Sequence, residues 1–113
     1  MELNWKSKEN KQLVSAFLEL KNPAEAEAFL RDLMTEGEIN EFANRLEAAR
    51  LLSQDTQYNA IIESTGLSST TVARVSKFLK GPLGGYRLIL SRLSNQHHHS
   101  PTKLGKGLSL SSH

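Results

Sequence analysis

Apolar residues recur at intervals of three and four positions along most of this chain, which is the spacing of one face of an α-helix. Two such stripes precede residue 35. The first predicts a helix over about 5–21. The second predicts a helix that Asn22 caps and Pro23 opens, ending near residue 34. We expect the second helix to bury its apolar side chains. Together the two stripes consist of Leu13, Phe17, Leu18, Leu20, Phe29, Leu30 and Leu33.

A third and longer stripe begins after a capping box, Thr35-Glu36-Gly37-Glu38. In this motif the threonine oxygen accepts one free backbone N–H while the glutamate reaches back to another. The sequence Gln54-Asp55-Thr56 then ends the helix. One continuous apolar face is expected along it, formed by Ile39, Phe42, Leu46, Ala49 and Leu52.

Three shorter helices are predicted after residue 56, over about 57–64, 69–79 and 84–93. No sustained apolar–polar alternation and no Asn-Gly or Asp-Gly turn indicates a strand. The expectation is therefore an all-α fold of about six helices within a domain of residues 1–94. The last helix is apolar almost all round at Leu88 to Leu90, which indicates burial against a partner chain. Residues 95–113 are rich in Ser, Gly, Lys and His, and are expected to form a disordered basic tail.

Residues 56–80 have the pattern of a helix-turn-helix. Its first helix needs apolar residues that face the second, its turn needs a residue that accepts positive φ, and its second helix needs a cap. Gly66 suits the turn, Leu67 is the apolar residue tucked into it, and Ser68 is the cap. Ile62 departs from the pattern, because many such motifs have a small residue there. The inward residues are expected to be Ile61, Ile62, Val72, Val75, Phe78 and Leu79.

Charge changes sign across this motif. Residues 1–63 hold seven Lys or Arg and twelve Asp or Glu, a balance of 7 − 12 = −5, whereas residues 64–113 hold seven Lys or Arg and no acid, a balance of +7. A motif whose second half carries only positive side chains suits a phosphate polyanion, because each neutralised phosphate releases counterions. We therefore predict that the chain binds double-stranded DNA through a recognition helix at about Ser69–Leu79.

The outward residues of that helix have the chemistry for the task. Small hydroxyls near a helix N-terminus meet base edges and phosphates, and Ala73 suits a thymine methyl group. Arg74 is expected to read guanine or grip a phosphate, and Lys77 and Lys80 to contact phosphates. An ordinary solvated helix face remains the alternative. The complete set of predicted DNA contacts is Gln57, Ser68, Ser69, Thr70, Thr71, Ala73, Arg74, Lys77 and Lys80.

Several function classes are disfavoured by what the sequence lacks. There is no cysteine, so a disulfide framework, a thiolate metal site and a cysteine nucleophile are excluded. The histidines are His97, His98, His99 and His113, all in the expected tail; adjacent histidines on a flexible chain make a poor metal site, and none is placed to partner a catalytic serine. No apolar run reaches the length of a membrane span. We expect a cytoplasmic protein that is not an enzyme and has no metal site.

The segments FLRDLMTEGEINEFANRLEAARLL, YNAIIESTGLSSTTVARVSKFLK and GGY resemble the Trp-repressor family, in its YerC/YecD-type branch, from about Phe29 to Tyr86. The resemblance implies an intertwined, all-helical homodimer whose two recognition helices meet successive major-groove faces of a palindromic operator, most often as a repressor.

The resemblance also raises the question of an effector. In the tryptophan-binding member two arginines hold the amino acid, and Arg45 and Arg74 match them. Val75 stands where that repressor has a glycine beside the indole, which argues against tryptophan as corepressor here. Arg45 has a structural alternative as an ion-pair partner of Glu41 or Glu38. No cofactor is expected, and a small-molecule effector is left open.

Two other functions fit the same helices. The acidic first half is a plausible surface for another protein, which would make the chain an interaction module. Alternatively, the chain would be an architectural protein that binds DNA without sequence specificity through its basic tail.

Overall fold

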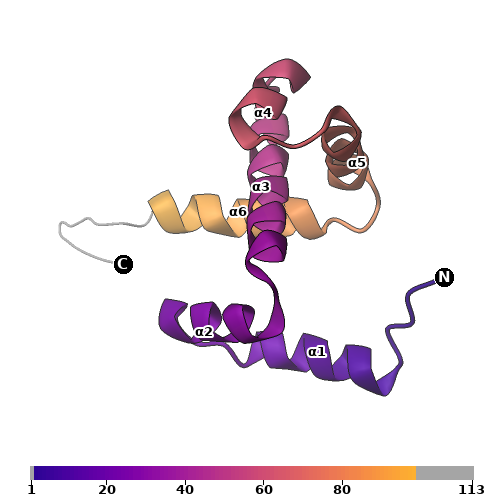
Figure 1. Ribbon diagram of the computed structural model, residues 1–113, viewed down its shortest axis with the longest axis vertical. Helices are drawn as coiled ribbons and strands as arrows, with labels where there is room; N and C mark the ends of the chain where they lie inside the picture. The colour runs from indigo at the N-terminus through magenta and orange to yellow at the C-terminus, as the bar shows by residue number, and fades with distance from the viewer. Residues whose placement is uncertain (1, 99–113) are drawn as a thin grey trace. The chain divides into compact units, whose positions relative to one another are not determined.

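The computed structural model describes residues 2–98, and within that range all regular secondary structure is helical. Figure 1 shows the helices in chain order. The chain divides into two compact units, Met1–Ile39 and Asn40–His113. Six helices, as the sequence predicts, span α1 Lys8–Leu18, α2 Pro23–Leu33, α3 Glu36–Ser53, α4 Tyr58–Thr65, α5 Ser69–Lys80 and α6 Gly85–His98.

The first unit has well-capped helices and no core of its own. The Ser7 hydroxyl accepts the N–H of Asn10 at the start of α1, and the Asn22 side chain accepts the N–H of Glu25 at the start of α2. Phe17 is the only residue of α1 that pairs rings with α2 within residues 2–98, edge to face on Phe29 with ring centroids 5.6 Å apart. Nevertheless no residue of α1 or α2 is buried.

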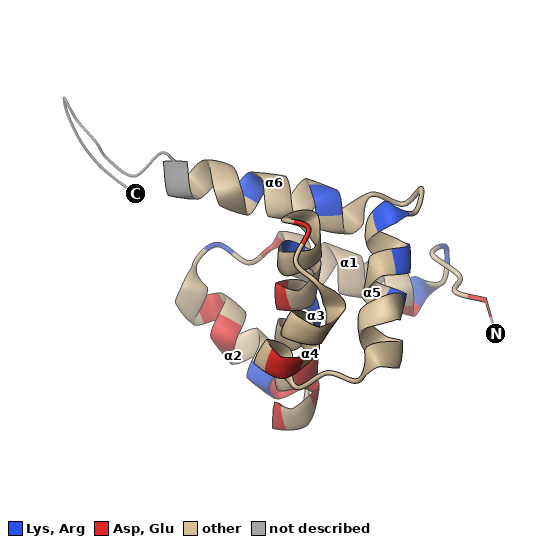
Figure 2. Cartoon of the chain, turned by 90° about the horizontal axis from the view of Figure 1, so that it is seen from above, with Lys and Arg blue, Asp and Glu red and all other residues tan. Residues whose placement is uncertain are grey.

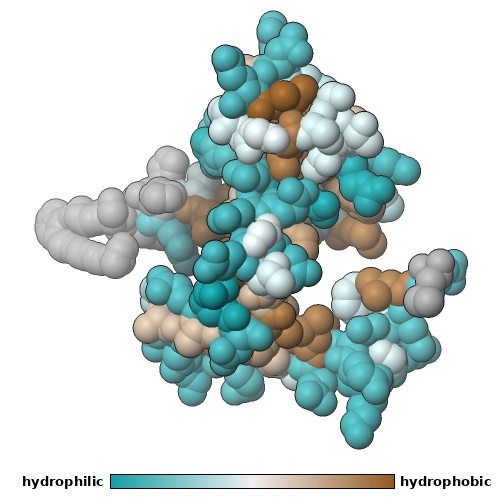
Figure 3. All heavy atoms as spheres, viewed as in Figure 1, coloured by the Kyte–Doolittle hydropathy of each residue, from teal (hydrophilic) through white to brown (hydrophobic). Residues whose placement is uncertain are grey.

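The prediction that α2 buries its apolar stripe is therefore wrong for the single chain. Leu33 is 46% exposed, while Phe29 and Leu30 are only partly covered, and Leu18 on α1 is 79% exposed. The physical reason is that two short helices that meet at few side chains, such as Phe17 and Phe29, cover little of each other's apolar surface. Figure 3 shows hydrophobic side chains at the surface of this unit.

The capping box before α3 forms as predicted. The Thr35 hydroxyl accepts the N–H of Glu38 at 3.1 Å, and the Glu38 carboxylate accepts the N–H of Thr35 at 2.9 Å. At its other end α3 is followed by Asp55, which has φ +61°, the left-handed conformation that commonly ends helices. The N–H groups of Asp55 and Thr56 bind the carbonyls of Leu52 and Leu51 there.

The second unit contains the hydrophobic core of the described chain. α3 contributes two alanines with no exposed surface, Ala48 and Ala49, and the side chains of α4 and α5 pack against them. Alanine allows a close approach, because its side chain ends at Cβ. The sequence pattern identifies Ala49, which lies three residues from both Leu46 and Leu52, but misses Ala48, which falls outside that spacing. The core comprises Ala48, Ala49, Ile61, Leu67, Val72 and Val75, with Leu51, Leu52, Ile62, Tyr86 and Leu90 partly buried around it.

α6 is longer than predicted and only half covered. It continues to His98, because no glycine or proline interrupts residues 86–98. Tyr86 and Leu90 pack on the core, while the side chains of Leu88, Ile89 and Leu93 remain 40–50% exposed. The rest of the predicted tail, residues 99–113, lies outside the described residues.

Candidate nucleic-acid interface

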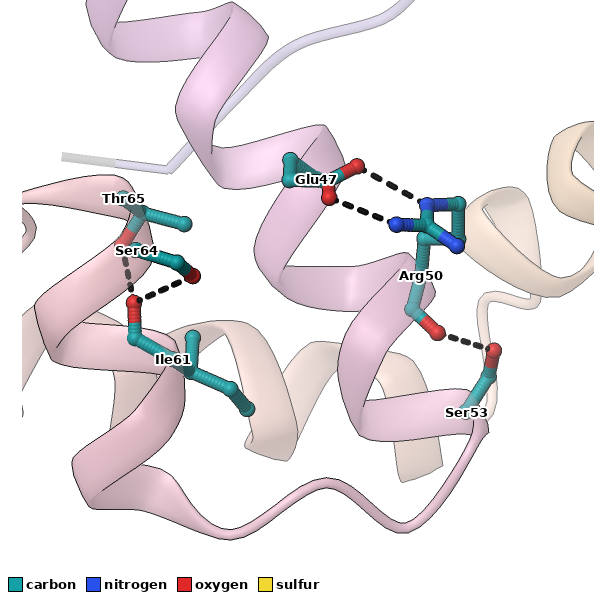
Figure 4. A network of polar contacts seen from close by, with 6 residues as sticks. All are labelled: Glu47, Arg50, Ser53, Ile61, Ser64 and Thr65. Atoms are coloured by element: carbon teal, nitrogen blue, oxygen red, sulfur yellow. Dashed lines mark hydrogen bonds and ion pairs between the residues drawn. The ribbon is translucent and has the colours of Figure 1, made fainter.

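The turn between α4 and α5 has the chemistry that the sequence predicts. Gly66 ends α4 at φ +76°, and its N–H donates to the Ile62 carbonyl at 2.9 Å. Thr65, which the sequence pattern does not single out, is buried beside it. Its hydroxyl donates to the Ile61 carbonyl at 2.7 Å and accepts the N–H of Leu67 at 3.2 Å. Figure 4 shows the Thr65 and Ser64 hydroxyls converging on the Ile61 carbonyl. The Thr65 hydroxyl therefore links the last turn of α4 to the backbone that leads into α5.

Ser68 caps α5, and its hydroxyl already makes hydrogen bonds within the chain. Its hydroxyl accepts the N–H of Thr71 at 3.1 Å and donates to the Thr71 hydroxyl at 3.0 Å. Consequently the Ser68 proton is already used. Ser69 and Thr70 are exposed, and the Thr71 hydroxyl keeps its own proton for a further acceptor.

The remaining predicted contacts share one face of α5. With ~100° between successive residues of a helix, they fall within an arc of roughly 140°. Every one of them is exposed, and none makes an ion pair within residues 2–98. Gln57 lies apart, at the N-cap of α4, where its side chain makes no capping hydrogen bond. The residues of the α5 face are Ser69, Thr70, Ala73, Arg74, Lys77 and Lys80.

Phe78 is the one predicted inward residue of α5 that the structure places differently. It is 48% exposed, whereas Val72, Val75 and Leu79 are buried as predicted. The reason is its place on the helix: Phe78 lies about 60° around α5 from the buried Val75, at the border of the buried face, and so stays half outside. Ile62, the off-pattern residue, is only partly buried at the edge of the same core, while Ile61 is fully buried.

Charge is distributed unevenly over the second unit. Figure 2 shows Lys and Arg on α5 and α6 and no acidic residue on either helix. On α3 the acids are partly neutralised: Glu47 and Arg50 form a double hydrogen bond at 2.8 and 2.6 Å (Figure 4). The hydrogen bond from Arg50 holds the pKa of the Glu47 carboxyl below its ordinary value, against the opposing effect of burial. The arginine of this pair is thus committed to its own helix.

Arg45 and Arg74, the two residues that the resemblance links to an effector, have different surroundings. The Arg45 guanidinium donates to Glu41 at 3.1 Å and lies over the Phe42 ring, 5.6 Å from its centroid. Arg74 is exposed and makes no ion pair within residues 2–98. Val75 is 2% exposed and part of the core, so its side chain fills space on the inner face of α5. Arg45 thus makes the ion pair with Glu41 that is its structural alternative, and an effector site at Arg45 and Arg74 stays a prediction.

One further side chain approaches α5, and the sequence analysis missed it. The guanidinium of Arg87 on α6 donates from Nη1 to the carbonyl of Leu79, in the last turn of α5. The only advance signal was that Arg87 belongs to the acid-free half of the chain.

Two negative findings apply to the described range. No helix within residues 2–98 has the length and apolar character needed to cross a membrane. The same residues contain no group of three or more His, Asp or Glu side chains that could hold a metal ion.

Comparison with known proteins supplies independent findings. The Trp repressor protein family model matches residues 8–94. The uncharacterised YerC protein of Bacillus subtilis strain 168 is 36% identical over 98 residues, which are 87% of this chain and 94% of YerC. A TrpR-like protein from Eubacterium eligens has a crystal structure that superposes with a TM-score of 0.76 at 36% identity, covering 80% of this chain and 93% of that one. A candidate Trp repressor from Staphylococcus aureus gives a TM-score of 0.74 at 31% identity, covering 79% and 89%.

Proposed function

Because this chain belongs to the Trp repressor family and is in general terms a DNA-binding regulator, we propose that it acts as a homodimer that reads double-stranded DNA in the major groove through α5. The sequence it reads would be palindromic, because a two-fold dimer presents two equivalent helices. Repression is the proposed outcome, and a cytoplasmic location and the lack of an enzymatic activity are proposed with it.

The observation that carries the proposal is the composition of the exposed face of α5. Two free hydroxyls lie in its first turn, at Ser69 and Thr70, followed by a methyl group and then by Arg74 and two lysines. This order supports base contacts at the N-terminal end of the helix, where recognition helices commonly read base edges, and phosphate contacts at the other end. The absence of acids on α5 and α6 removes repulsion from the DNA backbone.

The homodimer is supported by apolar surface that the single chain leaves open. In the first unit, no residue of α1 or α2 is buried, and a groove of about 250 Å³ lies between these helices. In the second unit, α6 exposes Leu88, Ile89 and Leu93 along one stretch. Exposed apolar side chains that gather on one surface often mark a site of interaction with another protein. A second copy would cover both. The groove is lined by Glu9, Gln12, Leu13, Ala16, Phe29 and Leu33.

We also propose that DNA binding does not require an aromatic amino acid. Val75 occupies the inner face of α5, and Arg45 is held by Glu41. The test is titration calorimetry with a panel of aromatic amino acids at a protein concentration of about 50 μM. No heat above dilution is expected, which means that no amino acid of the panel binds with a dissociation constant below about 1 mM. Heat on titration that disappears in Arg45→Ala would contradict this.

The decisive experiment is selection from a random pool of duplexes at physiological salt, read by sequencing. An enriched palindrome with half-sites about one helical turn apart, 10–10.5 base pairs, is the expected result. Enrichment of no sequence would refute sequence reading. If a variant shortened to residues 1–94 then lost most of the remaining affinity, the tail would be the binding element. Protein partners recovered after nuclease treatment would favour the interaction module instead.

On the selected operator, two substitutions separate base reading from phosphate binding. Arg74→Ala is expected to cost ~1–3 kcal/mol and to relax the preference at one base pair of each half-site. Lys80→Ala is expected to weaken all duplexes similarly and to lower the salt slope by about 1. If both substitutions leave duplex affinity unchanged, α5 is not docked in the proposed way.

A further inference from the structure

The C-terminal end of the recognition helix is held by a residue of the next helix. The last carbonyls of any α-helix have no partner within the helix. At the end of α5, the Phe78 carbonyl accepts the N–H of Gly81 at 3.2 Å, which is a local turn contact. The Leu79 carbonyl accepts instead from Arg87, eight residues further on and already within α6. This bond therefore connects two helices.

The turn between α5 and α6 leaves space for that guanidinium. Gly84 has φ +76°, a conformation that side-chain-bearing residues rarely adopt. A Cβ atom added to it would lie 3.3 Å from Nη2 of Arg87. One guanidinium nitrogen thus bonds to α5 while the other passes close to the backbone of Gly84. Arg87 takes part in no ion pair within residues 2–98, so no carboxylate draws it away.

α6 contributes side chains to two different surfaces. Tyr86 and Leu90 pack on the core of the reading unit, whereas Leu88 and Ile89 belong to the apolar surface that a second copy is proposed to cover. Arg87 lies between these positions in the chain. A side chain there that is bonded to the end of α5 connects the proposed dimer surface with the proposed DNA-reading helix.

We propose that Arg87 is a positioning residue that sets the angle of α5 relative to α6, and thereby the separation of the two recognition helices in the dimer. This inference rests on the proposed function. A change of angle alters the half-site spacing that a dimer accepts, because each added base pair moves a half-site by ~3.4 Å and rotates it by about 35°. Arg87 would then determine selectivity for spacing without touching a base.

The test measures affinity for the selected palindrome with zero to three base pairs added to or removed from its centre, at one salt concentration. The wild-type protein is expected to prefer one spacing by about tenfold or more over its neighbours. Arg87→Met keeps most of the side-chain length but removes the donors. It is expected to reduce this preference to about threefold or less, while the affinity for a single half-site stays within about twofold. Arg92→Met is the control, because Arg92 is also an exposed arginine of α6, about 140° around the helix from Arg87, and has no hydrogen bond within residues 2–98. Its spacing profile should keep the wild-type shape.

The outcomes separate the two proposals. A wild-type protein that selects no palindrome would refute the proposed function, and this inference with it. A wild-type protein with a sharp spacing preference that Arg87→Met retains would refute the positioning role alone. If the methionine variant does not fold, Arg87→Ala decides in the same assay. Alanine has no side-chain donor for the Leu79 carbonyl, so a broadened profile supports the role and an unchanged profile refutes it.

Discussion

At the scale of single residues, the turn of the helix-turn-helix depends on one hydroxyl. Thr65 is 8% exposed, and it is the only hydrogen-bond acceptor that the structure shows for the N–H of Leu67 within residues 2–98. The Ile61 carbonyl, in contrast, has a second donor, because the Ser64 hydroxyl also donates to it at 3.3 Å. Removal of the Thr65 hydroxyl therefore leaves one buried donor without a partner rather than two groups.

We accordingly expect Thr65→Val, which preserves the shape of the side chain, to lower the free energy of unfolding by ~1–3 kcal/mol. The measurement is urea denaturation followed by circular dichroism. Thr70→Val on the exposed face of α5 is the matched control and should change the same quantity by about 0.5 kcal/mol or less. Equal effects of the two substitutions would mean that the Thr65 hydroxyl does not stabilise the turn.

Glu47 gives a second prediction, this time for pH. Its pKa is lowered in the folded protein by the hydrogen bond from Arg50. The stabilisation is therefore complete above the unfolded value of 4.5 and disappears as the pH falls through the lower folded value. We expect the difference in unfolding free energy between wild type and Glu47→Gln to be small, because the pair is half exposed, and to shrink below pH 4.5. Glu63→Gln, at an exposed residue without an ion pair in the described range, should show no such trend.

At the scale of elements, the same residue type has opposite effects in a turn and in a helix. Gly66 adopts φ +76°, and an added Cβ would meet nothing within 4 Å, so the cost of a side chain there is purely conformational. Gly37 lies in the first turn of α3, and its added Cβ would be 3.9 Å from the Thr35 hydroxyl, an ordinary contact. Glycine is therefore required at the first position and merely tolerated at the second.

This contrast predicts changes of opposite sign. Gly66→Ala is expected to lower the free energy of unfolding by ~1–2 kcal/mol, since an L-residue pays that cost in the left-handed region. Gly37→Ala is expected to raise it by ~0.5 kcal/mol, because alanine loses less backbone entropy on folding. Both changes are read from the midpoint of denaturation with an unchanged m-value. A stabilised Gly66→Ala would show that the turn is not held in this conformation in solution.

At the scale of the whole molecule, the exposed apolar side chains link the stability of the fold to association with a second copy. The core of the described chain consists of alanine and aliphatic side chains, whereas large apolar side chains such as Phe17, Leu18 and Ile89 remain at least two-fifths exposed. If a second copy covers these residues in the proposed homodimer, part of the free energy of folding comes from association of the two chains.

The melting temperature is therefore expected to rise by several degrees when the protein concentration increases about a hundredfold. Leu88→Glu introduces a charge on the half-exposed face of α6 and should lower the melting temperature and weaken its dependence on concentration. Leu83→Glu is the control: Leu83 is 84% exposed in the turn before α6, so its substitution should change neither. Sedimentation of the wild type as a monomer at micromolar concentration would contradict the homodimer.

The sequence by itself determined the features that depend on local chemistry. Helix periodicity, the Thr35–Glu38 capping box, the cap at Ser68 and the left-handed Gly66 follow from interactions within four residues, and each is present as predicted. The outward face of α5 could be predicted for the same reason, since the buried positions of one helix leave its other side to solvent.

Only the tertiary structure decided the features that depend on which elements meet. Phe78 stays half exposed and Ala48 becomes core because burial depends on which helices pack together, and this core joins residues of α3, α4 and α5 that are far apart in the chain. The bond from Arg87 to the end of α5 exists because a turn with Gly84 at positive φ brings α6 back to α5. No periodic pattern encodes such a contact: local propensities specify each helix, whereas packing between helices sets which side chains are covered and which backbone groups they reach.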